Sequence, residues 1–157
     1  MTQGLSEKTW VRLGGLDQGM VIKSRDLRNP VLLYLHGGMP DYFLTERYPT
    51  GLEGLFTVVW WEQRGSGLLY HRGLDPDTVT PERMMEDALE LADHLRERFG
   101  RDRVYLMGHS GGTFLGIKLV VGRGLWNTQL ATDLTALVSR VEVPVYFLHG
   151  VHDYTVA

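Results

Sequence analysis

Cysteine is absent from this sequence of 157 residues. Its absence excludes a disulfide framework, a thiolate zinc site and a cysteine nucleophile. Long apolar runs are absent too, since none approaches the roughly 20 residues that span a bilayer. The N-terminal segment also lacks the basic and then apolar pattern of a secretory signal peptide. We therefore expect a cytoplasmic protein without a membrane partner.

The sequence also carries little net charge. Its 16 lysines and arginines nearly balance its 19 aspartates and glutamates, which gives a formal net charge of −3 at pH 7. Such a balance gives no indication of a nucleic-acid partner. A hydrophobic content of 43% is ordinary for a globular protein, and the length suits one domain over residues 1–157.

Strand and helix patterns alternate along the chain. Short strands at 10–13 and 19–23 flank a turn-like segment and predict an antiparallel hairpin at the N-terminus. Continuous apolar runs predict buried strands, and apolar residues three and four positions apart predict helices. The buried strands are expected at 31–35, 56–61, 103–107 and 144–148, and helices at 81–99 and about 128–139. This alternation predicts an α/β fold with a mostly parallel sheet.

Residues 81–99 give the clearest helix signal. Thr80 suits the N-cap, Pro81 suits the first helical position, and Gly100 suits the C-terminal stop. The helix is expected to bury one apolar stripe, formed by Met84, Ala88, Leu91, Leu95 and Phe99.

The pentapeptide Gly108-His109-Ser110-Gly111-Gly112 fits the pattern G-x-S-x-G. A strand is expected before it and a helix over 113–120 after it, which is the setting that holds a nucleophilic serine on a sharp turn. Outside that setting the pattern would be a chance tight turn. We therefore interpret Ser110 as a nucleophile.

A serine nucleophile needs backbone donors for the oxyanion, and its chemistry requires no cofactor. The N–H group of Gly111, directly after the serine, is one expected donor. The loop His36-Gly37-Gly38, which follows the strand at 31–35, should supply the second donor. We expect His36 to brace this glycine loop.

Asp153 follows the strand at 144–148, where a Ser…Asp…His order would place the acid that orients the base. The alternative is a turn aspartate that caps its own backbone. His149, His152 and Asp153 also form a small cluster of possible metal ligands, but their spacing matches no common zinc signature. We therefore predict no metal site.

No histidine stands where the catalytic base is expected. Only four residues follow Asp153, too few for another strand and a returning histidine. His71 lies in a loop and stays open as a base, His152 is awkwardly adjacent to the acid, and the other histidines are expected to be structural or solvated. Glu62 and Arg64 follow the strand at 56–61. They could form an ion pair beneath the site or contact substrate, and the structural role is favoured.

Three local signatures make the chain resemble the α/β-hydrolase superfamily, and within it the proline iminopeptidase-like enzymes. They are Leu35-His36-Gly37-Gly38, Trp61-Glu62-Gln63-Arg64-Gly65-Ser66-Gly67 and Gly108-His109-Ser110-Gly111-Gly112. The segment 149–153 is similar to the one that carries the acid. The resemblance implies Ser110 as the nucleophile, Asp153 as the acid, and the N–H groups of Gly38 and Gly111 as the oxyanion hole.

The chain departs from the family pattern in three places. Met39-Pro40 replaces the Pro-Gly that usually follows His-Gly-Gly. Only 43 positions separate Ser110 from Asp153, where members of the family place another strand and a helical cap, and residues 121–126 look like a join across that gap. The terminal strand with its histidine is missing. We therefore expect a shortened member of the family without the cap and without the histidine segment.

These residues predict a serine hydrolase of small esters, amides or short peptides. Without an evident histidine, we expect its turnover to be weak or absent. The alternative is a non-catalytic binding or scaffold domain on a hydrolase frame. The missing strands would leave exposed apolar sheet edges, so association or strand exchange between copies is expected.

Overall fold

The chain begins with an antiparallel hairpin. In the computed structural model, which describes residues 3–40, 42, 44–67 and 74–121, β1 (Leu5–Leu13) pairs with β2 (Leu16–Ser24). Gly14 and Gly15 form the turn with φ angles of 52° and 77°, which residues with a side chain rarely adopt. The predicted hairpin is confirmed. Its strands are longer than expected because the pairing runs without interruption from Leu13 and Leu16, beside these glycines, to Leu5 and Ser24.

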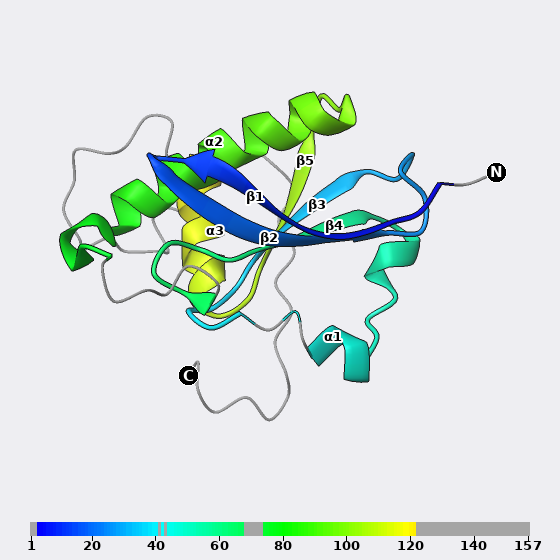
Figure 1. Ribbon diagram of the computed structural model, residues 1–157, viewed down its shortest axis with the longest axis horizontal. Helices are drawn as coiled ribbons and strands as arrows, with labels where there is room; N and C mark the ends of the chain where they lie inside the picture. The colour runs from blue at the N-terminus through cyan, green and yellow to red at the C-terminus, as the bar shows by residue number, and fades with distance from the viewer. Residues whose placement is uncertain (1–2, 41, 43, 68–73, 122–157) are drawn as a thin grey trace.

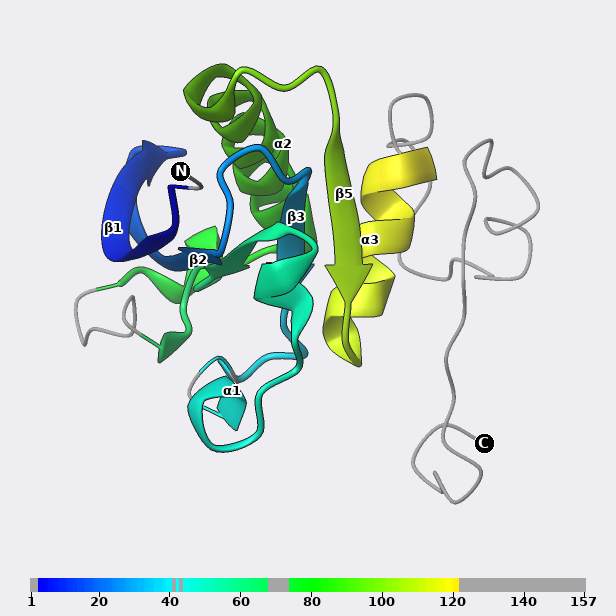
Figure 2. The same cartoon turned by 90° about the vertical axis from the view of Figure 1, so that its right-hand side faces the viewer.

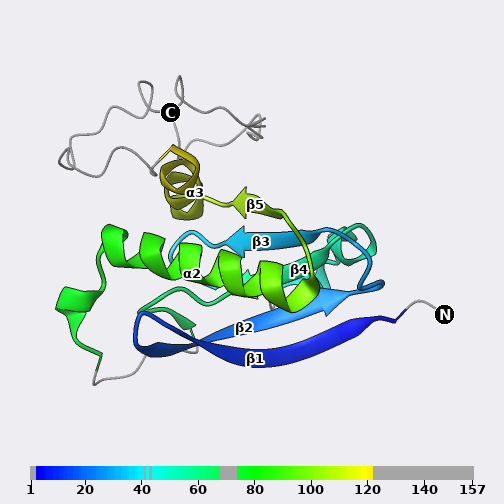
Figure 3. The same ribbon diagram turned by 90° about the horizontal axis from the view of Figure 1, so that it is seen from above.

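Five strands form one mixed sheet in the order β1-β2-β4-β3-β5. β2 pairs antiparallel with β4 (Thr57–Trp61), whereas β3 (Val31–Leu35) pairs in parallel with both β4 and β5 (Val104–Gly108). The predicted parallel arrangement therefore applies to the three strands β4, β3 and β5. Figure 3 shows β1 and β5 at opposite edges of this sheet.

The carboxyl ends of the parallel strands lie together. Leu35 at the end of β3 lies opposite both Trp61 of β4 and Gly108 of β5. The segments that follow these three strands therefore leave the sheet at the same edge, which is where α/β proteins place their ligand sites.

Each face of the sheet has its own apolar cluster. One face packs against α2 (Pro81–Phe99) and α3 (Gly111–Val121). The other face carries a smaller cluster beside η1 (Leu52–Gly54), and Figure 1 shows α1 (Leu44–Arg47) on that side, away from α2. The buried members of this smaller cluster are Val21, Leu32, Val58 and Trp60.

The helix predicted at 81–99 is confirmed with the same bounds as α2, which follows the short η3 (Pro76–Thr78). The Thr80 hydroxyl accepts a hydrogen bond from Arg83 N–H at 3.1 Å, and Gly100 ends the helix with a φ of 60°. Of the predicted stripe, three members are buried and the two outer ones pack at its margin. The buried side chains of the helix are Met85, Asp87, Ala88, Leu91 and Leu95.

The strand expected at 103–107 is present as β5 but is not buried. Tyr105 is 51% exposed, Leu106 36% and Met107 37%. Within the described residues β5 is the last strand of the sheet and pairs only with β3, so its second edge has no neighbouring strand. Figure 2 shows β5 leading into α3, which runs back alongside it.

The expected helix at about 128–139, the strand at 144–148 and, apart from Val121, the join at 121–126 lie outside the described residues. None of the helices in the described part combines the length and the apolar character needed to cross a membrane.

Candidate active site

Ser110 occupies the sharp turn between β5 and α3. Its φ is 52°, and among the described residues it is the one non-glycine residue with a positive φ. Such a conformation costs roughly 1–3 kcal/mol and is typical of functional turns. Two backbone hydrogen bonds of 2.9 Å fix the turn, from Gly112 N–H to His109 O and from Thr113 N–H to Ser110 O.

Glycines allow this turn to lie directly against β3. His109 N–H donates to Leu35 O at 3.0 Å. A Cβ on Gly112 would overlap the same Leu35 carbonyl, and a Cβ on Gly108 would lie 2.6 Å from Gly112 O. Neither position can therefore hold a side chain unless the backbone moves.

Gly37 brings the loop after β3 into contact with Ser110. A Cβ on Gly37 would lie 2.6 Å from Ser110 Cβ and 3.1 Å from Ser110 Oγ, and a Cβ on Gly111 would lie 3.6 Å from Gly37 O. Gly111 is the first residue of α3, and the first amides of a helix have no acceptor within it. The structure thus brings together Ser110, Gly37 and Gly111.

His36 is buried under this loop, at 3% exposure, with both ring nitrogens engaged. Gly38 N–H donates to Nδ1 at 3.1 Å, and Gln63 N–H points to Nε2 at 3.2 Å. The Gln63 side-chain amide donates to His36 O at 3.0 Å. Gly38, the second predicted oxyanion donor, therefore has an acceptor within its own loop.

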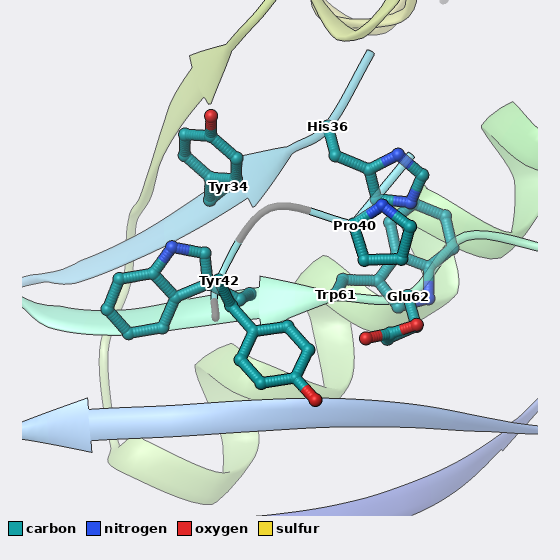
Figure 4. A pocket seen from close by; sticks show the side chains of 7 residues that line it. Tyr34, His36, Pro40, Tyr42, Trp61 and Glu62 are labelled. Carbon is teal, nitrogen blue, oxygen red and sulfur yellow. The ribbon is translucent and has the colours of Figure 1, made fainter. Parts of the chain in front are cut away.

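Glu62 supports the same loop from the end of β4. It is 2% exposed and lines a pocket at the carboxyl ends of β3 and β4. A Cβ on Gly67 would overlap the Glu62 carboxylate and lie 2.5 Å from Pro40 Cγ, so these three residues are in close contact. Figure 4 shows His36 beside Pro40 and above Glu62. The pocket is lined by Tyr34, His36, Pro40, Tyr42, Trp60, Trp61 and Glu62.

Arg64 pairs with Asp87 of α2, and not with Glu62. Its guanidinium donates to both carboxylate oxygens of Asp87, at 2.8 and 3.1 Å, and both side chains are buried. A bidentate pair of this kind is among the strongest hydrogen-bonded contacts in proteins. The interpretation of Glu62 and Arg64 as an ion pair is thus wrong, because the Arg64 side chain reaches the helix instead. At 5% exposure, Arg64 has a structural place.

The Arg64–Asp87 pair is the buried centre of a larger hydrogen-bonded network, which extends to the surface at Arg83 and Glu90. Gln18 donates to Asp87 at 2.7 Å and accepts a hydrogen bond from the Trp61 indole at 3.0 Å. Arg83 pairs with Asp87 and with Glu90, at 3.0 and 2.8 Å. Burial alone would lower the pKa of Arg83, but the pairs with Glu90 and Asp87 outweigh it and raise that pKa. The network ties the hairpin, β4 and α2 to the loop at 62–67.

Sequence patterns alone do not mark Asp87, Gln18 or Ser66 as part of this region. The signal for Asp87 is its place next to Ala88, inside the apolar stripe of α2, where a charged residue needs a buried partner. Ser66 lies within the signature at 61–67, and its hydroxyl contacts His36 Nε2 at 3.0 Å.

The predicted acid, Asp153, and three histidines, His71, His149 and His152, lie outside the described residues. Among the hydrogen bonds of the described part, none joins the Ser110 hydroxyl to an imidazole, and His36 has both nitrogens engaged elsewhere. The described residues contain no group of three side chains suited to a metal ion.

Comparison with known proteins gives likeness in both sequence and fold. No family model matches the chain. The protein named probable aminopeptidase YbaC, from Bacillus subtilis (strain 168), is 35% identical over 113 residues, which are 71% of this chain and 36% of that protein. This chain thus spans little more than a third of the curated relative's length.

Comparison with solved structures leads to proteins of a similar kind. The proline iminopeptidase-related protein of Thermus thermophilus superimposes with a TM-score of 0.56 at 30% identity, over 73% of this chain and 40% of that one. An α/β hydrolase from Novosphingobium aromaticivorans superimposes with a TM-score of 0.59 at 26% identity, over 76% of this chain and 40% of that one. Likeness in sequence and likeness in fold lead to the same conclusion: the chain belongs to the α/β-hydrolase superfamily.

Proposed function

We propose that this chain carries the nucleophile of a serine hydrolase that cleaves ester or amide bonds through an acyl-enzyme. The observation that carries the proposal is the strained backbone of Ser110, held against Gly37 at the carboxyl edge of the parallel strands. Strain at one residue of a tight strand-to-helix turn is the expected signature of an exposed nucleophile.

In the proposed chemistry the Ser110 hydroxyl loses its proton and attacks the carbonyl carbon of the ester or amide. The C–O or C–N bond then breaks and the alcohol or amine leaves with a proton, and water hydrolyses the acyl-enzyme to release the acid and restore Ser110. In this proposal the donors to the developing oxyanion are Gly111 N–H, at the start of α3, and Gly38 N–H, which must leave His36 Nδ1 to reach a substrate oxygen. The N-terminus of α3 also favours negative charge there. In this proposal Asp153 is the acid of the triad, and the reaction needs no cofactor.

We take small esters, amides or short peptides as the substrate class. Support comes from the names of the relatives, one an aminopeptidase and one proline iminopeptidase-related. Met39 and Pro40, which follow the glycine loop, depart from the family's usual Pro-Gly. We therefore do not commit the chain to an N-terminal proline.

Turnover of the 157-residue chain is expected to be low. The low value is the expectation from the sequence pattern, in which no histidine stands where the family places its base, and a serine triad without its base typically turns over about 10⁴- to 10⁶-fold more slowly. The second candidate function is a non-catalytic binding domain on a hydrolase frame.

Labelling with a fluorophosphonate and hydrolysis of p-nitrophenyl acetate test both candidates. We expect slow labelling and weak ester cleavage, both abolished by Ser110→Ala. Ser24→Ala is the matched control, because Ser24 is a buried serine at the far end of β2, and it should behave as the wild type. Stoichiometric labelling at an ordinary serine-hydrolase rate would show that a working base exists. Ester cleavage unaffected by Ser110→Ala would favour the binding domain.

A further inference from the structure

Two backbone N–H groups approach the two ring nitrogens of one buried imidazole, that of His36. Gly38 N–H lies 3.1 Å from His36 Nδ1, and Gln63 N–H lies 3.2 Å from His36 Nε2. A neutral imidazole has one N–H and one acceptor nitrogen. It can therefore accept a hydrogen bond from Gly38 or from Gln63, but not from both at once.

The Ser66 hydroxyl favours one of these two arrangements. Its oxygen lies 2.6 Å from Gln63 O and 3.0 Å from His36 Nε2. A carbonyl oxygen can only accept, so the single hydroxyl proton of Ser66 is on the Gln63 side. The Ser66 oxygen is then an acceptor toward Nε2, and this favours a proton on Nε2.

We infer that Ser66 is a positioning residue, which holds His36 in the Nε2–H tautomer and thereby keeps Gly38 N–H bound to Nδ1. The hydrogen bonds form a directed chain, from Gly38 through His36 and Ser66 to Gln63 O. The inference rests on the proposed function in one respect, because Gly38 matters as an oxyanion donor only if Ser110 is the nucleophile.

The other tautomer would reverse the assignment. With the proton on Nδ1, the ring turns an N–H toward Gly38 N–H, which releases that amide, while Nε2 accepts from Gln63 N–H. One proton position therefore determines whether Gly38 is held within its own loop or is free to face a substrate oxygen. Gly37, which contacts Ser110, lies between His36 and Gly38 in this loop.

Nitrogen-15 NMR of the His36 ring tests the inference directly, because protonated and acceptor ring nitrogens resonate far apart. The wild type should show Nε2 protonated and Nδ1 as the acceptor. Loss of one hydrogen bond in Ser66→Ala should shift the tautomer ratio toward Nδ1–H by about tenfold. The amide exchange of Gly38 should become faster in the same variant. Ser66→Thr keeps the hydroxyl and should restore the wild-type pattern.

Ser24→Ala is again the matched control, since it removes a buried serine hydroxyl that bonds Asp26 O and Thr57. It should leave the His36 tautomer unchanged. A wild-type ring protonated on Nδ1, or a tautomer ratio that is the same in Ser66→Ala, would overturn the inference. A Ser110 that fails to react, in a protein with the expected tautomer, would instead overturn the proposed function and leave the role of Ser66 standing.

Discussion

Arg64 and Asp87 form a buried ion pair in which both charged groups make several hydrogen bonds. Asp87 is fully buried and receives hydrogen bonds from Arg64, Gln18 and Arg83. Arg64 also donates to the Gly14 carbonyl of the hairpin turn, at 3.2 Å. Taking two charges out of water is costly, and such a pair is retained only where hydrogen bonds satisfy both groups.

Arg64→Met is therefore expected to destabilise the protein by about 3–5 kcal/mol, because it leaves the Asp87 carboxylate buried without its main partner. The measurement is the free energy of unfolding in urea. Arg12→Met is the matched control, since Arg12 pairs with Asp17 at the surface with side-chain exposures of 69% and 67%. An exposed pair contributes about 1 kcal/mol or less. Equal losses in the two variants would contradict the proposed importance of the buried network.

At the scale of elements, two glycines of α3, Gly112 and Gly116, differ in how closely they approach β3. A Cβ on Gly112 would overlap the carbonyl of Leu35, whereas a Cβ on Gly116 would meet only Leu35 Cδ1 at 3.6 Å. The first is a backbone collision and the second is an ordinary van der Waals contact.

Gly112→Ala should therefore destabilise the protein by at least roughly 1–3 kcal/mol, the usual cost of overpacking, and should slow labelling of Ser110 by separating the turn from Gly37. Gly116→Ala should instead stabilise it by roughly 0.5–1 kcal/mol, because alanine favours the helix interior. Thermal unfolding and fluorophosphonate labelling measure both effects. If Gly112→Ala were as stable and as reactive as Gly116→Ala, the close packing of this turn would be refuted.

The helix α2 and the strand β5 show which features a local sequence can specify and which it cannot. The bounds of α2 were predictable because Thr80 and Gly100 are local caps. The partner of Arg64 was not, because Asp87 lies 23 positions away and is brought close only by packing of α2 on the sheet. Likewise, the apolar residues of β5 predict a buried strand. Whether β5 is buried depends on the elements that pack beside it, and the sequence of β5 itself does not specify them.

For the whole molecule, the two edges of the described sheet differ in chemistry. β1 carries Glu7, Lys8 and Arg12 along its length, and charged residues protect an edge strand from pairing with another chain. β5 carries no charged residue and exposes apolar side chains, and no strand of the described part pairs with its outer edge. An edge of this kind is a template for a further strand.

We therefore expect the 157-residue chain to associate through β5 at tens of micromolar, as measured by light scattering during size-exclusion chromatography. Tyr105→Lys should shift the protein toward the monomer, because it places a charge on this edge. Trp10→Lys is the matched control: Trp10 lies on the opposite edge strand and is 52% exposed, against 51% for Tyr105, so it should leave the association unchanged. A monodisperse wild-type monomer would contradict the prediction, and equal effects of the two variants would show that exposed apolar area, and not the β5 edge, drives association.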